Sequence, residues 1–141
     1  MTDLTLTVER TIQAPPETVF NAWLDPEMMR RFLMPRETMS VPSASNDPRE
    51  GGRFDILMRS DDREFPHWGI YREIRPHDRL VFTWQSPFSV EDSTVTLTFA
   101  PVDSGTHVTL TQVRFHDAEA RDSHANGWTG ILESLAKKLA A

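Results

Sequence analysis

Apolar and polar residues alternate along the start of the chain and again through its middle. A repeat of two is typical of strands with one buried face. The pattern predicts strands over residues 4–12, 53–59, 67–74, 79–85, 94–100 and 106–114. The polar, turn-rich segments 41–52 and 60–66 are expected to be loops, and Asp103-Ser104-Gly105 to be a tight hairpin turn. Strands joined by such short connections should pair antiparallel.

The repeat changes to a helical one in two parts of the chain. Pro15-Pro16 and Asp25-Pro26 each predict the start of a short helix after the first strand, because proline suits the first helical turn and aspartate the N-cap. Residues 117–139 predict a long helix. Its apolar side chains fall within an arc of about 100°: Trp128, Ile131, Leu132, Leu135 and Leu139.

These elements predict an α+β fold in one domain spanning residues 1–141. An antiparallel sheet leaves one face that must be covered. The long C-terminal helix is the largest apolar element available to cover it. We therefore expect a curved sheet of six to seven strands around that helix, with two short helices after the first strand.

Composition excludes several classes of protein. The chain has no cysteine, so a disulfide framework, a thiolate nucleophile and a thiolate metal site are all ruled out. Its net charge of −6 disfavours nucleic-acid binding, which needs a basic surface. The first residues do not resemble a signal peptide, and no apolar run approaches the ~20 residues of a membrane span. We predict a cytoplasmic protein.

Several segments together resemble a known family. They are Arg10-Thr11-Ile12-Gln13-Ala14-Pro15, Val19-Phe20-Asn21-Ala22-Trp23, Gly51-Gly52-Arg53-Phe54, Arg79-Leu80-Val81-Phe82-Thr83-Trp84 and Gly127-Trp128 with the leucines behind it. In this order they are similar to bacterial single-domain relatives of the C-terminal domain of the Hsp90 ATPase activator (AHSA1-like), in the START-like or Bet v1-like (SRPBCC) superfamily. The resemblance implies a helix-grip fold with a central cavity. It implies no single activity, because the superfamily includes lipid carriers, hormone receptors and cyclases.

Two departures from the family pattern bear on partners. Many relatives carry a Trp-Trp pair where this chain has Arg31-Phe32-Leu33-Met34-Pro35. The activator also has an N-terminal domain with its own signature, which this sequence lacks. We therefore expect no Hsp90 contact, and the sequence leaves open a homodimer.

The expected cavity lies between the sheet and the C-terminal helix. Apolar walls with a few polar groups are typical of small-molecule sites, although ordinary core packing explains the same residues. Tyr71, Gln112 and His124 are polar and in phase with the buried faces, so we expect them to orient a ligand. The predicted lining is Phe54, Ile56, Met58, Tyr71, Phe82, Trp84, Phe99, Leu110, Gln112, His124, Trp128 and Leu132.

No sequence motif indicates catalysis or a cofactor. Spacings typical of zinc sites, serine nucleophiles and phosphate loops are all missing, so we predict no catalytic residue, metal or cofactor. Gly127 and Gly130, inside the long helix, indicate either close packing or a hinge.

Three functions remain open. The first is binding of a small hydrophobic or amphipathic molecule in the cavity. The second is an enzyme of cyclase, hydratase or hydrolase type that uses the same cavity, with Tyr71, His67 and His124 as titratable groups. The third is a co-chaperone-like partner module, with an apolar outer patch formed by Trp68, Ile70, Val81 and Phe88.

Overall fold

The computed structural model describes residues 4–87 and 89–139, and within them seven strands form one antiparallel sheet. The strand order is β1-β7-β6-β5-β4-β3-β2, and each neighbouring pair is antiparallel. The strands are β1 (Thr5–Ile12), β2 (Ser40–Asn46), β3 (Arg53–Ser60), β4 (Arg63–Arg75), β5 (Arg79–Thr83), β6 (Thr94–Val102) and β7 (Gly105–Val113). β6 and β7 are joined through the turn that Asp103-Ser104-Gly105 predicts.

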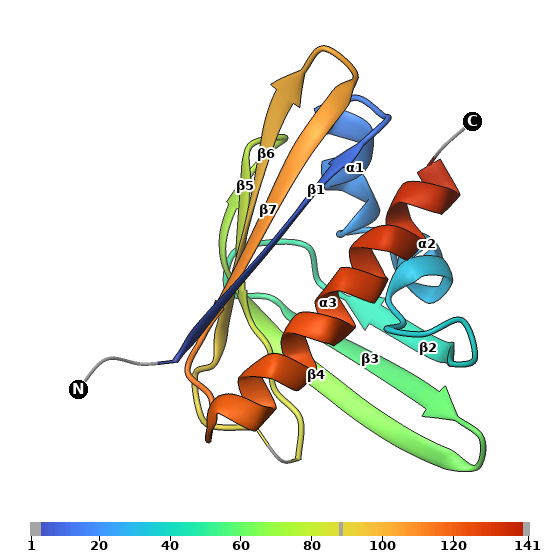
Figure 1. Ribbon diagram of the computed structural model, residues 1–141, viewed down its shortest axis with the longest axis vertical. Helices are drawn as coiled ribbons and strands as arrows, with labels where there is room; N and C mark the ends of the chain where they lie inside the picture. Colours follow the sequence, from blue (N-terminus) through green and yellow to red (C-terminus); the bar gives the residue numbers. More distant parts are fainter. Residues whose placement is uncertain (1–3, 88, 140–141) are drawn as a thin grey trace.

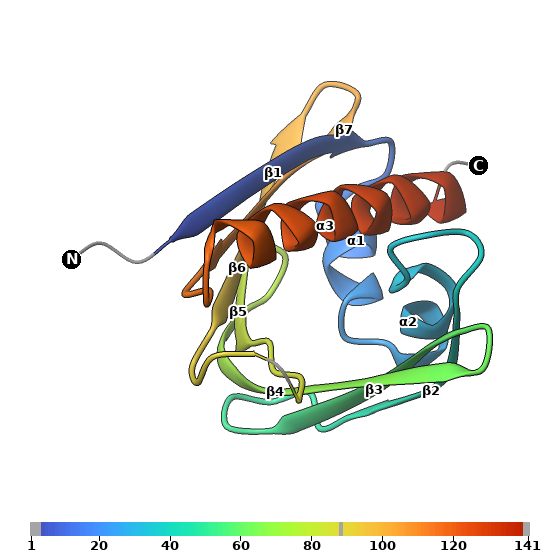
Figure 2. The same ribbon diagram turned by 60° about the horizontal axis from the view of Figure 1, so that its bottom comes forward.

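Three helices cover the concave face of this sheet (Figures 1 and 2). They are α1 (Pro16–Ala22), α2 (Pro26–Phe32) and α3 (Ala118–Leu139). Asp25 caps α2 as expected, since its carboxylate accepts a hydrogen bond from the Glu27 amide at 3.0 Å. Figure 2 shows the sheet curling from β1 round to β2, with α3 beside β1 and the two short helices in the remaining opening.

The core lies between α3 and the concave face. Trp128, Leu132 and Leu135 are at most 2% exposed. Facing them, alternate residues of β6 and β7 are buried, from Val95 to Phe99 and from Val108 to Gln112. The α+β helix-grip prediction is therefore confirmed.

The prediction that residues 41–52 are a loop was wrong in its first half. Residues 40–46 form β2, an edge strand that pairs only with β3. Edge strands tolerate polar residues and proline, because one side of their backbone needs no partner. β2 contains Pro42, and its pairing register shifts between Ser40 and Ser43. The segment therefore lacks the alternation of apolar and polar residues that identifies inner strands.

The prediction that residues 60–66 are a loop was also wrong. Ser60 pairs with Arg63, so the connection is only the two-residue turn Asp61-Asp62. Asp61 has φ 56°, a left-handed conformation that aspartate tolerates better than most residues. β4 therefore begins at Arg63, and the β3–β4 hairpin extends beyond the well-covered part of the sheet. Its first residues are exposed, which hid the strand pattern.

Candidate functional site

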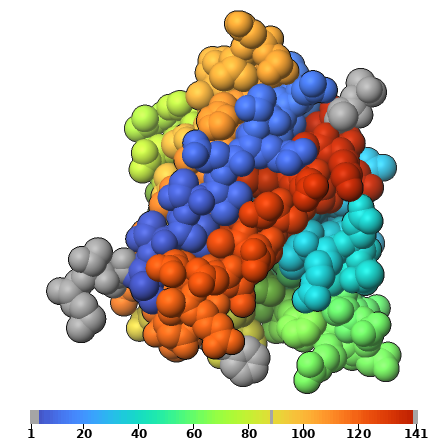
Figure 3. Space-filling model, viewed as in Figure 1, coloured from blue at the N-terminus to red at the C-terminus, as the bar shows by residue number. Residues whose placement is uncertain are grey.

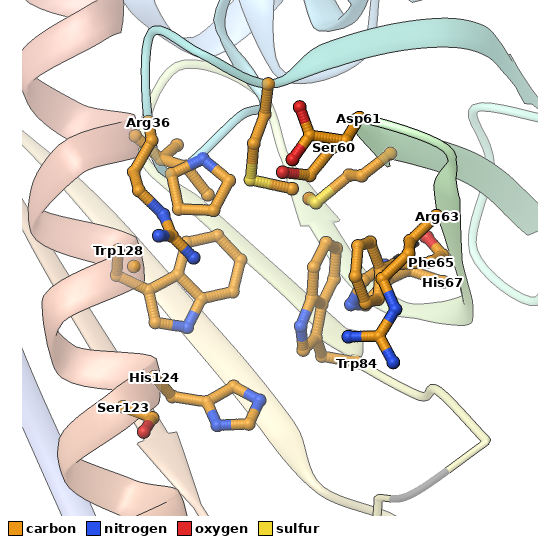
Figure 4. Close-up of a pocket in the computed structure, with 15 residues that line it drawn as sticks. Arg36, Ser60, Asp61, Arg63, Phe65, His67, Trp84, Ser123, His124 and Trp128 are labelled. Carbon is orange, nitrogen blue, oxygen red and sulfur yellow. Dashed lines mark hydrogen bonds between the residues drawn. The ribbon is translucent and has the colours of Figure 1, made fainter.

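A cleft of about 450 Å³ opens between α3 and the β3–β4 hairpin. Figure 3 shows these two elements on the same face of the molecule. The hairpin side of the lining, drawn in Figure 4, is Met58, Ser60, Asp61, Arg63, Phe65 and His67. The helix side is Ser123, His124, Gly127, Trp128 and Ile131. The loop after α2 and the end of β5 complete it with Pro35, Arg36, Met39 and Trp84.

Local structure explains why these side chains meet. Residues three or four apart share one face of a helix, so His124, Trp128 and Ile131 form a stripe along α3. In the hairpin, Met58 pairs with Phe65 and Ser60 with Arg63. Cross-strand partners lie on the same face of a sheet, so both pairs point toward the helix.

Two tryptophans form the floor of the cleft. The rings of Trp84 and Trp128 have centroids 4.8 Å apart, tilted by 57°. Trp84 and Trp128 are only 4% and 2% exposed, so the cleft ends on well-packed rings. The Trp128 indole donates to Gln112 Oε1 at 2.7 Å, and Gln112 Nε2 donates to Ser93 Oγ at 2.9 Å. This buried chain of hydrogen bonds fixes the orientation of the floor.

Two histidines stand on opposite walls. His67 Nδ1 lies 3.0 Å from the Phe65 carbonyl, and His124 Nδ1 lies 2.8 Å from the Ala120 carbonyl. A carbonyl only accepts hydrogen bonds, so each Nδ1 carries the proton, and Nε2 is the free acceptor in the neutral ring. The pKa of His67 is lowered from 6.5 to about 4, mainly by burial; the Phe65 carbonyl opposes this shift and the nearby His124 adds to it. His67 is therefore a neutral acceptor near pH 7, with its ring stacked on Trp84 at 4.8 Å.

The rim of the cleft is polar. Arg36, Asp61 and Arg63 are exposed and surround the opening. Phe65 adds an apolar ring there and is 36% exposed, which is unusual for a large aromatic side chain in this protein. An apolar floor beneath a polar rim suits a molecule with both kinds of surface.

The predicted lining residues separate into three groups. Met58, Trp84, His124 and Trp128 line the cleft. Trp84 also borders an inner void of about 10 Å³, room for at most one water, with Phe54, Ile56, Tyr71 and Phe82. Phe99, Leu110, Gln112 and Leu132 are buried and lie outside both linings. Ligand binding by any of these residues stays a prediction.

Tyr71, expected to orient a ligand, faces the inner void instead of the cleft. It is 2% exposed, and its hydroxyl accepts a hydrogen bond from Asn46 Nδ2 at 3.1 Å. Burial raises the pKa of Tyr71 to about 12, against a smaller lowering by Asn46, so the hydroxyl stays protonated. Asn46 Nδ2 also donates to the Leu24 carbonyl at 2.8 Å, which ties β2 to the end of α1.

Sequence reasoning missed much of the rim. Ser60, Asp61, Arg63 and Phe65 lay in a segment that was predicted to be a loop, and Arg36 lay in a connection. The sequence signal for the hairpin was the turn-forming pair Asp61-Asp62 after the alternating residues 53–59, but the exposed residues that follow the turn do not alternate. No comparable signal placed the loop after α2 beside α3.

The two glycines of α3 explain how that loop is placed. A Cβ on Gly130 would lie 2.1 Å from the Pro35 carbonyl oxygen, so the loop packs directly on the helix backbone there. At Gly127 the nearest atom would be Pro35 Cβ at 3.5 Å, an ordinary contact. Gly130 therefore has the close-packing role, and hinge motion stays a prediction.

Two further observations concern metals and membranes. The described residues contain no group of three or more histidine, cysteine, aspartate or glutamate side chains able to hold a metal ion. Across residues 4–87 and 89–139, no helix is both long and apolar enough to pass through a bilayer. Of the predicted outer patch, Trp68, Ile70 and Val81 are half-buried, and Phe88 lies outside the described residues. A partner surface there stays a prediction.

Comparisons with known proteins agree with this architecture. The family model described as "Activator of Hsp90 ATPase homolog 1-like protein" matches residues 13–140. A crystal structure from Chromobacterium violaceum is 27% identical, covers 96% of each chain and has a TM-score of 0.85. One from Mesorhizobium loti is 28% identical, with 96% of each chain covered and a TM-score of 0.78.

A solution structure of an AHSA1-like protein from Aeromonas hydrophila is 24% identical. It covers 95% of this chain and 90% of its own, with a TM-score of 0.83, and shows the shared fold. No curated protein matches the sequence.

Proposed function

The chain belongs to the family of Activator of Hsp90 ATPase homolog 1-like proteins, and from this premise we propose that it binds a small amphipathic molecule in the cleft between α3 and the β3–β4 hairpin. One observation carries the proposal: an open cleft of about 450 Å³ ends on the rings of Trp84 and Trp128. Small-molecule sites are concave, have mainly apolar walls and measure roughly 300–1,000 Å³. No chemical step is needed for this function.

The expected affinity is moderate. A bicyclic aromatic body that buries roughly 200 Å² gains about 5 kcal/mol at ~25 cal/mol per Å². Contacts at the rim add to this gain, and the loss of ligand freedom reduces it. Dissociation constants between about 1 μM and 1 mM are therefore expected.

The test uses N-phenyl-1-naphthylamine, an uncharged probe whose emission rises in apolar surroundings. We expect saturable binding to the intact chain. The variant Ser123→Trp places a large ring at the helix side of the cleft and should weaken binding at least tenfold. Thr129→Trp is the matched control, since Thr129 is exposed on the same helix and outside the lining.

Two results would contradict the proposal. One is the lack of saturable binding by this probe and by fatty acids, flavonoids and polyketides. The other is equal binding by Ser123→Trp and Thr129→Trp, which would place the probe elsewhere. Circular dichroism of both variants checks that each is folded.

An enzyme in the same cleft is the second candidate, and the two histidines favour it. His67 and His124 both line the cleft, and the neutral form of each offers a free Nε2 as a proton acceptor. Mass spectrometry of a bound ligand after long incubation would detect conversion. Loss of that conversion in both His67→Gln and His124→Gln, with binding retained, would support catalysis.

A further inference from the structure

We propose that the ligand is an apolar or aromatic carboxylic acid, whose carboxylate meets Arg36 and Arg63 while its body lies on Trp84 and Trp128. This inference rests on the proposed function and names its ligand class. It joins two observations: an apolar floor, and two guanidinium groups at the rim that have no acidic partner among residues 4–87 and 89–139.

The two arginines reach the cleft from different elements. Arg63 is the first residue of β4 and shares the cleft face with Phe65 and His67. Arg36 comes from the loop after α2. In Figure 4, Arg36 lies on the Trp128 side of the cleft and Arg63 on the Trp84 side. A group bound at the mouth would therefore have a cation on each side.

Neither guanidinium is neutralised by the part of the protein that the structure describes. No carboxylate there forms an ion pair with Arg36 or Arg63, although Asp61 belongs to the same lining. Most other arginines do have an acidic partner, namely Arg49, Arg53, Arg59, Arg72, Arg75, Arg79 and Arg121. Arg10, Arg30, Arg31 and Arg114 also lack an acidic partner among the described residues, so the contrast is with the paired arginines. Of the six unpaired ones, Arg36 and Arg63 are the two that line the cleft.

Arg59 makes the contrast sharpest. It lies in the same hairpin and pairs with Glu64 at 2.6 Å. The alternation of β3 and β4 puts this pair on the face away from Met58, Phe65 and the cleft. The β3–β4 hairpin therefore has the paired Arg59 on its outer face and the unpaired Arg63 on the face that lines the cleft.

Charge and geometry both select a carboxylate. The whole chain has 21 acidic residues against 15 lysines and arginines, yet the described lining has two arginines and one aspartate. A planar guanidinium binds a carboxylate through two parallel hydrogen bonds. An ammonium group would be repelled by both arginines. The neutral His67 ring adds no charge, but its free Nε2 can accept a hydrogen bond from a hydroxyl on the ligand.

The experiment compares three ligands with one aromatic body: 2-naphthoate, 2-naphthalenemethanol and 2-naphthalenemethylamine. Each displaces N-phenyl-1-naphthylamine from the intact chain at low salt. We expect 2-naphthoate to bind about tenfold more tightly than the alcohol, and the amine to bind most weakly. The advantage of the acid should shrink as salt is added.

Variants test which arginines produce the preference for 2-naphthoate. Arg36→Gln and Arg63→Gln should each weaken 2-naphthoate binding about three- to tenfold and leave the alcohol within twofold of its original affinity. The double variant should bind acid and alcohol equally. Arg59→Gln removes the same charge from the outer face of the hairpin and should change none of the three affinities.

Failure of this inference can be told apart from failure of the proposed function. If probe and alcohol bind but the acid has no advantage, or the Arg36 and Arg63 variants change nothing, the carboxylate assignment is wrong and the cleft remains a binding site. If Arg59→Gln acts as strongly as Arg63→Gln, the preference is general electrostatics and the assignment is also wrong. If neither probe nor alcohol binds, both proposals fail.

Discussion

The concave face of this one sheet is closed at one end and open at the other. At the closed end, α1 packs on β6, where the rings of Phe20 and Phe99 meet edge to face at 5.3 Å and both are 2% exposed. At the open end, the β3–β4 hairpin extends beside α3, and Phe65 is 36% exposed at the rim of the cleft. Both ends have inward-facing apolar side chains, so an apolar inner face does not by itself decide whether an end is closed.

The difference comes from the number of elements covering each end. The closed end has a short helix as well as α3 to fill the space. At the open end α2 packs on the edge strand β2, and the residues that line the cleft opposite the hairpin come from α3, the loop after α2 and the end of β5. That loop packs on the helix backbone at Gly130. In this fold a cleft remains where the covering elements end, and a closed core forms where they continue.

The largest effect should separate a core leucine from a cleft methionine. Leu132 is 0% exposed and lies outside the lining, so Leu132→Ala should leave a cavity and lower the free energy of unfolding by about 3–5 kcal/mol. Met58 borders the cleft, where the surroundings can relax or hydrate, so Met58→Ala should cost about 2 kcal/mol or less. Urea unfolding measures both. Equal losses would mean that the wall of the cleft is packed as tightly as the core.

The next effect tests the loop that limits the cleft. Gly130→Ala would force a Cβ to within 2.1 Å of the Pro35 carbonyl oxygen, and the loop would have to move. We expect a loss of about 2–3 kcal/mol of unfolding free energy and altered probe binding. Gly127→Ala is the matched control, because its Cβ has room and alanine favours the helix by up to about 1 kcal/mol.

The two glycine variants should change the free energy of unfolding in opposite directions. Thermal or urea unfolding should show Gly130→Ala less stable than the parent chain and Gly127→Ala equally or more stable. A stable Gly130→Ala would show that the loop is not fixed by this contact, and the hinge interpretation would regain support.

A third effect depends on pH. The pKa of His67 is about 4 in the folded chain and near 6.5 when unfolded, mainly because burial disfavours the charged ring. Between these values the unfolded chain binds more protons, so His67 makes the protein less stable as pH falls from about 6.5 to about 4. The effect should be roughly 1–3 kcal/mol, because the ring is only partly enclosed.

The variant His67→Gln isolates this contribution. The variant lacks the stack on Trp84, so its free energy of unfolding should be lower than that of the parent chain. This difference should be largest near pH 7. It should shrink toward pH 4, because the parent chain then loses the stability that depends on a neutral His67. Urea unfolding of both proteins at several pH values gives the difference, and the carboxylates common to both cancel. A difference that is constant with pH would contradict the lowered pKa.

The sequence predicted the buried core and the floor of the cleft far better than the rim. Val95, Leu97 and Phe99 follow a clean repeat of two, and Trp128 with Leu132 and Leu135 follows a helical repeat. Burial on one face produces such repeats, so the fold and the helix position could be predicted. The same repeats predict that Trp84, Trp128, Met58 and His124 face inward, and all four line the cleft.

The rim could not be predicted in this way. Arg36, Ser60 and Arg63 face water on one side and the cleft on the other, so no periodic burial marks them. Their meeting depends on how far the hairpin projects and on the contact between Pro35 and Gly130. These are tertiary features that a single sequence does not encode locally.

The smallest effect concerns the aspartate at the rim. Among the described residues that line the cleft, Asp61 is the only acidic one, and it opposes a bound carboxylate. Asn also tolerates the left-handed φ of 56°, so Asp61→Asn should change unfolding free energy by less than about 0.5 kcal/mol. Removing the charge should tighten 2-naphthoate binding about two- to threefold at low salt and leave the affinity for 2-naphthalenemethanol unchanged.

Asp62→Asn is the control, since Asp62 is the neighbouring turn residue outside the lining. Equal gains from both variants would mean that net charge, rather than the open end of the sheet, governs the preference for acids.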